Sequence, residues 1–165
     1  MKKIILAGGC FWGVEAYFKQ LKGILTTKVG YIDGEYNDPS YDEVCSGMAT
    51  HAEAVEIFYD DTIITLPELL EHYFRIINPT SINRQGADEG HQYRTGIYFR
   101  GMEDLKIIID FIKEEQKKYD EIIVVEVKTE SYFSAAEEQH QDYLSKNPNG
   151  YCHVNLSLID ESEKK

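Results

Sequence analysis

Residues 3–18 are K-I-I-L-A-G-G-C-F-W-G-V-E-A-Y-F, an apolar run that two glycines join to a helix-like pattern. The run from Lys3 to Ala7 predicts a short buried strand. Beyond the glycines, apolar residues recur at the spacing of one helix face, at Phe11, Val14, Phe18 and Leu21. The stretch therefore predicts a strand that leads almost directly into a helix, with a cysteine, Cys10, at the junction.

The residue pattern predicts four more strands, at 26–32, 52–59, 95–100 and 122–127. Capping boxes that begin at Thr65 and Ser134 predict two helices, and one that begins at Ser40 predicts a short helical turn. A further helix is expected after residue 100, with four apolar residues facing inward: Leu105, Ile108, Ile109 and Ile112.

Only a short helical turn is expected between strands 26–32 and 52–59, so these strands lack the crossover helix that a parallel pair needs. The order of elements predicts an α+β fold, a split β-α-β (ferredoxin-like) sandwich with a mostly antiparallel sheet and helices packed on it. A doubly wound parallel sheet is the alternative. Residues 1–165 are expected to form one domain, with 153–165 as a charged, mobile tail.

The composition is that of an ordinary globular protein, with 42% hydrophobic and 28% charged residues in 165. The net charge of -12 argues against a nucleic-acid-binding surface, which needs clustered Lys and Arg. No apolar run approaches the roughly 18 residues that a membrane span requires. The apolar stretch Ile4–Ala7 is also too short for a signal peptide, so a cytoplasmic protein is expected.

Three cysteines, Cys10, Cys45 and Cys152, lie far apart and form no C-x-x-C pair, so neither a zinc site nor a disulfide scaffold is expected. At the start of a helix, the dipole and free backbone N–H groups favour the thiolate of Cys10 and lower its pKa. The neighbouring glycines leave room for another molecule to approach. The alternative is that Cys10 is a small buried apolar residue, and that Trp12 packs under a loop instead of lining a pocket.

Five ordered blocks resemble the peptide methionine sulfoxide reductase A family, and they extend over nearly the whole chain. The blocks are G-C-F-W-G-V-E (Gly9–Glu15), Pro39–Gly47, His51–Val55, Asn83–Gly86 with Asp88 and Gln92–Arg94, and His140–Leu144 with Lys146–Cys152. The resemblance implies reduction of methionine S-sulfoxide, free or within oxidised proteins and peptides, with thioredoxin (or dithiothreitol in vitro) as reductant. No bound cofactor, no metal, and no membrane or nucleic-acid partner is expected, and nothing in the sequence demands more than a monomer.

The same resemblance assigns a role to each matched residue. Cys10 would attack the sulfoxide sulfur and become a sulfenic acid, and Cys152 would resolve it as a Cys10–Cys152 disulfide. Glu53 would donate a proton to the sulfoxide oxygen. The remaining matches are the tyrosines that hold that oxygen (Tyr41 and Tyr93), the methyl pocket (Phe11 and Trp12), and a residue of the substrate site (Asp88).

The chemistry of the residues agrees in part with these roles. Glu53 shares the apolar face of its strand with Val55 and Ile57, where desolvation would raise its pKa and keep a proton for donation. Alternatively, it reaches water at the strand end as a surface acid. Cys152 follows a Pro-Asn-Gly bend, so the expected tail could swing it to Cys10.

Some features depart from the family pattern or favour other functions. No cysteine follows Cys152, so its disulfide with Cys10 would be terminal, while Cys45 is expected to be buried, with a backup resolving role as the alternative. Thr50 and Ala87 stand where the pattern has glycine and asparagine. His51 could instead pair with Cys10, as in a thiol hydrolase. A peptide-binding module without chemistry is a third possibility, in which Cys10 would be unreactive.

Overall fold

The computed structural model describes residues 1–165. Its strands are β1 (Lys2–Gly8), β2 (Ile24–Ile32), β3 (Ala52–Tyr59), β4 (Arg84–Gln85), β5 (Asp88–Glu89), β6 (Thr95–Phe99), β7 (Glu126–Thr129) and β8 (Ser134–Ala135). Its α-helices are α1 (Phe11–Phe18), α2 (Tyr41–Ser46), α3 (Leu66–Ile76), α4 (Met102–Gln116) and α5 (Tyr143–Lys146). Four 3-10 turns complete the chain: η1 (His91–Tyr93), η2 (Glu138–His140), η3 (Leu156–Leu158) and η4 (Glu161–Glu163).

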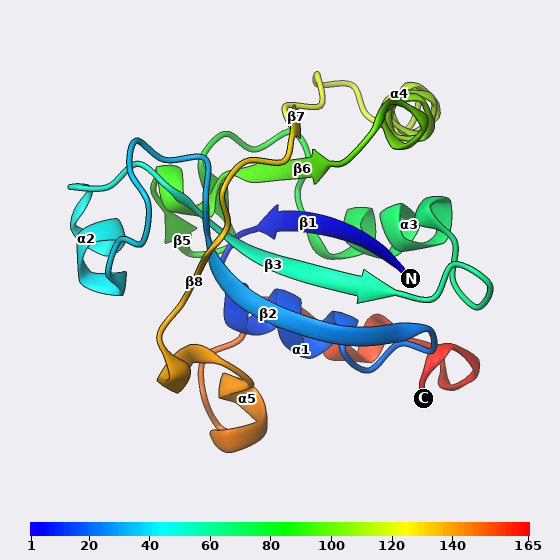
Figure 1. Cartoon of the computed structure of the whole chain (residues 1–165). Coiled ribbons are helices and arrows are strands. Elements are labelled where there is room, and N and C mark those ends of the chain that lie inside the picture. The colour runs from blue at the N-terminus through cyan, green and yellow to red at the C-terminus, as the bar shows by residue number, and fades with distance from the viewer.

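Six strands form one sheet in the order β7-β6-β1-β3-β2-β8 (Figure 1). Every neighbouring pair is antiparallel except β6 and β7, which run parallel. The sheet is therefore mostly antiparallel and the fold is α+β, as the sequence predicts. The doubly wound parallel alternative is wrong, because β1 and β3, at the centre of the sheet, run in opposite directions.

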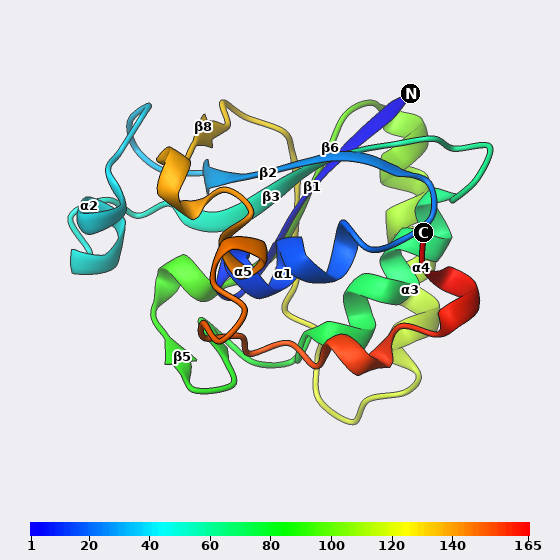
Figure 2. The same cartoon turned by 90° about the horizontal axis from the view of Figure 1, so that it is seen from below.

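Helices cover mainly one face of this sheet, where α1 and α3 lie together with the C-terminal segment (Figure 2). The strands alternate in what they bury there, so Ile4 and Leu6 of β1 and Val55 and Ile57 of β3 all join the main core. Residues of the opposite pleat form a smaller cluster, against which Phe133 packs: Ile5, Ala7, Ile32, Ala52, Ala54 and Tyr98.

The capping boxes at Ser40 and Thr65 are confirmed, because each hydroxyl accepts a hydrogen bond from the backbone N–H of the glutamate three residues later. The prediction of a capping box and a helix at Ser134 is wrong. Ser134 lies in β8, paired with β2, and the last helix, α5, begins only at Tyr143. The Ser-x-x-Glu pattern is local and gives no information about a sheet edge that is available for pairing.

Two further predictions for the second half of the chain need correction. The strand expected at 122–127 is shifted to Glu126–Thr129, where the backbone pairs with β6. In α4, Ile108 is buried but Ile109 is 43% exposed, so the helix turns a narrower apolar face inward than expected. No helix here has both the length and the apolar character needed to cross a bilayer.

The C-terminal segment packs against the domain and does not form the expected tail. Val154 and Ile159 are buried in the main core. The backbone N–H of Lys165 donates to the carbonyl of Gln20 at 2.9 Å, and that of Lys22 donates to the carbonyl of Glu163 at 2.9 Å. The end of the chain is rich in charged residues, but its few buried apolar residues hold the segment against the helix-covered face of the sheet.

Candidate active site

The strand-to-helix junction places Cys10 immediately before α1, in the N-cap position. Gly9 supports this turn with φ +89, a left-handed conformation that favours glycine, and a Cβ there would lie 2.8 Å from the Cβ of Gln85. The placement of Cys10 is the one expected. Its environment is not, because the residue is only 5% exposed.

Burial decides the state of this thiol. It raises the pKa of Cys10, and the nearby carboxyl of Glu53 raises it further, while a hydrogen bond from the backbone N–H of Trp12 acts in the opposite direction. The expected lowering by the helix start is therefore wrong for the substrate-free protein. One or two backbone donors do not compensate for the removal of a thiolate from water.

Glu53 of β3 lies on the helix-covered face and points at the start of α1. Its Oε1 accepts a hydrogen bond from the backbone N–H of Phe11 at 3.2 Å, and its Oε2 is buried without a partner. The residue is 1% exposed, and burial, followed by the negative charge of Asp88, raises its pKa to about 8. Glu53 therefore carries a proton at neutral pH, and the alternative of a solvated surface acid is wrong.

Two tyrosines that the resemblance selects lie in this neighbourhood. Tyr41 is the first residue of α2, which the Ser40 capping box fixes, and Tyr93 ends η1. Burial is the largest cause that raises the pKa of each hydroxyl; next come a hydrogen bond with Cys45 for Tyr41 and the charge of Glu53 for Tyr93. Both hydroxyls thus remain protonated donors near the Glu53 carboxyl.

Aromatic rings form a stack beside Cys10. Trp12 lies parallel to Tyr143, with ring centroids 3.9 Å apart, and its Nε1–H donates to Nδ1 of His140 at 3.3 Å. His140 also stacks on Tyr41 at 4.3 Å. Phe11 is fully buried against this group, so it supports the pocket from behind, while the half-buried Trp12 presents the accessible ring. Sequence reasoning missed His140, although it lies in a matched block.

The C-terminal segment closes the other side of the junction. Tyr151 donates a hydrogen bond to Asp88 of β5 at 3.0 Å, and the next residue, Cys152, lies against α1. A Cβ on Gly13 would be 3.1 Å from the sulfur of Cys152. The expected open space around the glycines is thus partly filled by the sulfur of Cys152, which the packed C-terminal segment holds beside α1.

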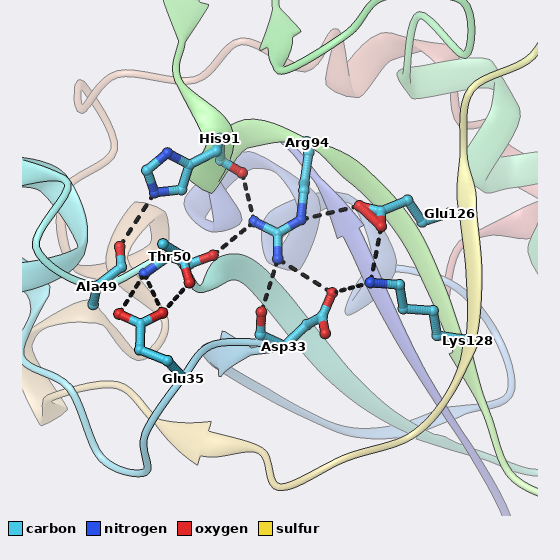
Figure 3. A network of polar contacts seen from close by, with 8 residues as sticks. All are labelled: Asp33, Glu35, Ala49, Thr50, His91, Arg94, Glu126 and Lys128. Atoms are coloured by element: carbon cyan, nitrogen blue, oxygen red, sulfur yellow. Dashed lines mark hydrogen bonds and ion pairs between the residues drawn. The ribbon is translucent and has the colours of Figure 1, made fainter.

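Arg94 connects the loops around this site (Figure 3). Its guanidinium donates to three backbone carbonyls, those of Asp33 (3.0 Å), Thr50 (3.0 Å) and His91 (2.8 Å). It also pairs with the carboxylates of Asp33 and Glu126. One side chain, 14% exposed, therefore ties the end of β2, the approach to β3, η1 and β7 together. Arg94 follows Tyr93 directly, but nothing in its sequence context signals so many partners.

Glu35 and Lys128 extend the same network. Glu35 accepts hydrogen bonds from the backbone and hydroxyl of Thr50, and Lys128 pairs with Asp33 at 2.7 Å and with Glu126 at 3.0 Å. Thr50, the departure from the family pattern, therefore uses its hydroxyl to hold the adjacent loop.

His51 does not take its alternative role, and Cys45 is more exposed than expected. Nε2 of His51 lies 2.6 Å from the carbonyl oxygen of Tyr36, and no histidine nitrogen makes a hydrogen bond to Cys10, so the Cys-His pair of a thiol hydrolase is absent. Cys45 is exposed on α2, where a buried residue was expected. All three cysteines are free thiols.

Comparison with known proteins gives one consistent result. The family model described as Peptide methionine sulfoxide reductase matches residues 2–165. "Peptide methionine sulfoxide reductase MsrA" of Clostridium tetani is 56% identical over 156 residues, which cover 94% of this chain and 95% of the relative. The corresponding protein of Alkaliphilus metalliredigens is 54% identical over 158 residues, or 96% of this chain and 100% of the relative.

Solved structures agree with the sequence relatives. Reduced Mxr1 from Saccharomyces cerevisiae superimposes with a TM-score of 0.88 at 41% identity, covering 93% of this chain and 91% of the yeast chain. Mxr1 in complex with Trx2 superimposes with a TM-score of 0.62 at 31% identity, covering 86% and 84% of the two chains.

Proposed function

The chain belongs to the peptide methionine sulfoxide reductase family and is an oxidoreductase that reduces methionine sulfoxide, and from this premise we propose how its residues act. Cys10 is the nucleophile, Glu53 the proton donor, and the S epimer of the sulfoxide the substrate. The observation that carries the proposal is the protonated Glu53 carboxyl beneath the helix start that holds Cys10, with its Oε2 buried and free of any partner.

In the reductive step the Cys10 sulfur attacks the sulfoxide sulfur while Glu53 protonates the departing oxygen. The hydroxyls of Tyr41 and Tyr93 donate hydrogen bonds to that oxygen, and the Trp12 ring, supported by Phe11, holds the methyl group. Asp88 lines the substrate site. The attack forms an S–S bond between Cys10 and the sulfoxide sulfur. This bond breaks as the protonated oxygen passes to Cys10, which leaves a sulfenic acid on Cys10 and releases methionine, and the thiol proton replaces the one that Glu53 gave.

The buried thiol requires that ionisation accompany substrate binding. The sulfoxide sulfur carries partial positive charge, and its arrival beside Cys10 favours the thiolate. A neutral Glu53 leaves no negative charge of its own to oppose ionisation, whereas an ionised one would raise the pKa of Cys10 further. A reactive thiolate then exists only with substrate in place, so side reactions of the free protein are suppressed.

Cys152 completes the cycle by attacking the sulfenic sulfur, with loss of water and formation of the Cys10–Cys152 disulfide. Thioredoxin reduces this disulfide, a role supported by the complex of the similar yeast Mxr1 with Trx2. Oxidised proteins, peptides and free methionine sulfoxide are the substrates. The sequence of steps balances with thiols alone, so no bound cofactor or metal takes part.

The proposal also covers the topology of the core, the cellular compartment and the oligomeric state. The element order β1-α1-β2-β3-α3-β6, with strand order β6-β1-β3-β2 at the centre of the sheet, supports a split β-α-β (ferredoxin-like) core. Three unpaired thiols suit the reducing cytoplasm. The protein acts as a monomeric single domain, since Cys10, Glu53 and Cys152 all gather around the start of α1 without a residue from a second copy.

The test compares the protein with Cys10→Ser and Cys152→Ser on the two sulfoxide epimers. The S epimer alone should be reduced, and Cys10→Ser should release no methionine. Cys152→Ser should give one equivalent of methionine and then stop with thioredoxin as reductant. Normal cycling of Cys152→Ser on thioredoxin would overturn the assignment of the resolving residue, and a disulfide to the exposed Cys45 would identify its replacement.

A further inference from the structure

His153, next to the proposed resolving cysteine, is held in one tautomer. Its Nε2 lies 2.9 Å from the carbonyl oxygen of Gly8. A carbonyl only accepts hydrogen bonds, so Nε2 carries the ring proton and Nδ1 has a free lone pair. Nδ1 is buried and has no hydrogen-bond partner.

That free nitrogen and the sulfur of Cys152 lie at the same place on α1. A Cβ on Gly13 would be 3.1 Å from the Cys152 sulfur and 3.3 Å from Nδ1 of His153. Both atoms therefore occupy the space above the first turn of α1 that the glycine leaves open. Cys10 directly precedes that turn, so donor, acceptor and target lie around the same turn of α1.

Cys152 needs help to become a nucleophile. Its thiol donates a hydrogen bond to the carbonyl of Val154 at 3.2 Å, and burial raises its pKa. At neutral pH it is therefore protonated, and a protonated thiol attacks a sulfenic acid poorly. A base within the pocket would remove this obstacle.

Resting on the function proposed above, we propose that Nδ1 of His153 takes the proton of Cys152 during disulfide formation. The Cys152 thiolate then attacks the sulfenic sulfur of Cys10, the S–S bond forms, and the S–O bond breaks. The hydroxide leaves as water by taking the proton from His153. His153 returns to its neutral form, and no other reductant is consumed.

The surroundings keep His153 neutral and available. Burial lowers its pKa, while the hydrogen bond to Gly8 and the charge of Asp88 on β5 raise it. The titratable groups that face it are Asp88 itself, the thiol of Cys152 beside it, and Tyr151, whose hydroxyl donates to Asp88, while β1 and α1 contribute glycines there. An imidazole whose charged form is disfavoured keeps its lone pair free at neutral pH.

His153→Gln tests the proposal, because a glutamine amide can still donate to the Gly8 carbonyl but supplies no base. Methionine formation in the first turnover should keep the wild-type rate, which also reports correct folding. Loss of the Cys152 free thiol reports disulfide formation, because Cys10 is already a sulfenic acid, and this loss should slow about 100-fold at pH 7. In the variant this rate should rise about tenfold per pH unit as Cys152 ionises by itself, whereas the wild-type rate should vary little with pH above the His153 pKa.

A second variant separates loss of the base from loss of structure. In His153→Ala, added imidazole should accelerate disulfide formation without changing the first turnover. Disulfide formation in His153→Gln at the wild-type rate, or slowing by the same factor at every pH, would overturn the role of His153. Failure of the underlying function gives a different result, because Cys152→Ser would then cycle on thioredoxin whatever residue stands at 153.

Discussion

Among single residues, the chemistry depends on two buried acids that keep their protons, the Cys10 thiol and the Glu53 carboxyl. The sequence locates both correctly: the alternation of β3 places Glu53 on the core face, and the glycine turn places Cys10 before α1. It misjudges the thiol, because the dipole of a short helix is a local feature while desolvation depends on everything packed around it. The same desolvation makes Glu53 a proton donor.

Glu53 should give the reductive step a falling limb in alkaline solution. Since its pKa is raised to about 8, the donor is lost above that pH, and the single-turnover rate of methionine formation should decline. Glu53→Gln should be slower by about 100-fold or more and lack this decline. Single-turnover reactions, quenched at a series of times between pH 6 and 9.5, measure the rate of methionine formation for the wild type and the variant.

Alkylation of Cys10 by iodoacetamide serves as the control, because Glu53→Gln removes a nearby carboxyl and should not slow it. A wild-type rate of methionine formation that keeps rising through pH 9, or the same alkaline decline in the variant, would contradict the donor role of Glu53.

Glu53 should also make stability depend on pH. Its pKa rises from 4.5 to about 8 on folding, so the folded state binds a proton that the unfolded state has lost across this interval. The contribution to stability is full below pH 4.5 and is lost as the pH rises towards 8. The free energy of unfolding, measured with urea, should fall by up to about 1.4 kcal/mol per pH unit from this residue. For Glu53→Gln, the plot of unfolding free energy against pH should have a slope smaller by that amount. Parallel plots for the variant and the wild type would refute the raised pKa.

At the level of strands and helices, the sequence predicts an element correctly when the contacts that form it are local. It fails when pairing with a distant strand determines the structure. The capping boxes before α2 and α3 form as predicted, because both partners lie within four residues. The similar pattern at Ser134 is overridden, since β2 offers a free edge to which residues 134–135 bind. The loops of the site behave similarly: Arg94 joins segments that are distant in sequence.

Arg94→Ala should loosen these loops and destabilise the protein. The guanidinium satisfies three carbonyls and pairs with two carboxylates. Water replaces most of these partners once the side chain is removed, so the net loss is close to that of one hydrogen bond to a charged group, about 1.5–3 kcal/mol. We expect the free energy of unfolding to fall by about 2–3 kcal/mol. The KM for the sulfoxide should rise because Tyr93 loses its support.

Arg100→Ala is the matched control, since Arg100 pairs with Glu130 at 2.6 Å but is 67% exposed. This substitution should lower the free energy of unfolding by less than about 1 kcal/mol and leave the KM for the sulfoxide unchanged. Equal effects of the two substitutions would mean that Arg94 is only another surface cation.

Across the molecule as a whole, the last thirteen residues hold Cys152 in place. Val154 and Ile159 anchor them in the core, and η4 docks on α3 through Glu163, whose carboxylate accepts two hydrogen bonds from Arg75 at 3.1 and 3.2 Å. Arg75 lowers the pKa of Glu163 below its ordinary value. The docked end thus helps to keep Cys152 beside α1.

Glu163→Gln should lower the free energy of unfolding by about 1 kcal/mol at neutral pH. Because the pKa of Glu163 is lowered on folding, this difference is present above pH 4.5 and should disappear as the pH falls through the folded-state pKa. Glu161→Gln is the control, since Glu161 is 91% exposed and pairs only with Lys164. Urea unfolding at pH 7 and pH 3 that shows no difference between the two variants would contradict the docking role.

The sequence by itself determined the α+β class, the strand-to-helix turn at Cys10, the capped starts of α2 and α3, and the face of β3 on which Glu53 lies. These features follow from spacing and from partners a few residues apart. Only the tertiary structure decided that Cys10 is desolvated, that Ser134 is in a strand, that Arg94 connects four segments, and that the end of the chain packs beside α1. Each of these depends on contacts between distant segments, because burial and pairing are properties of the assembled core.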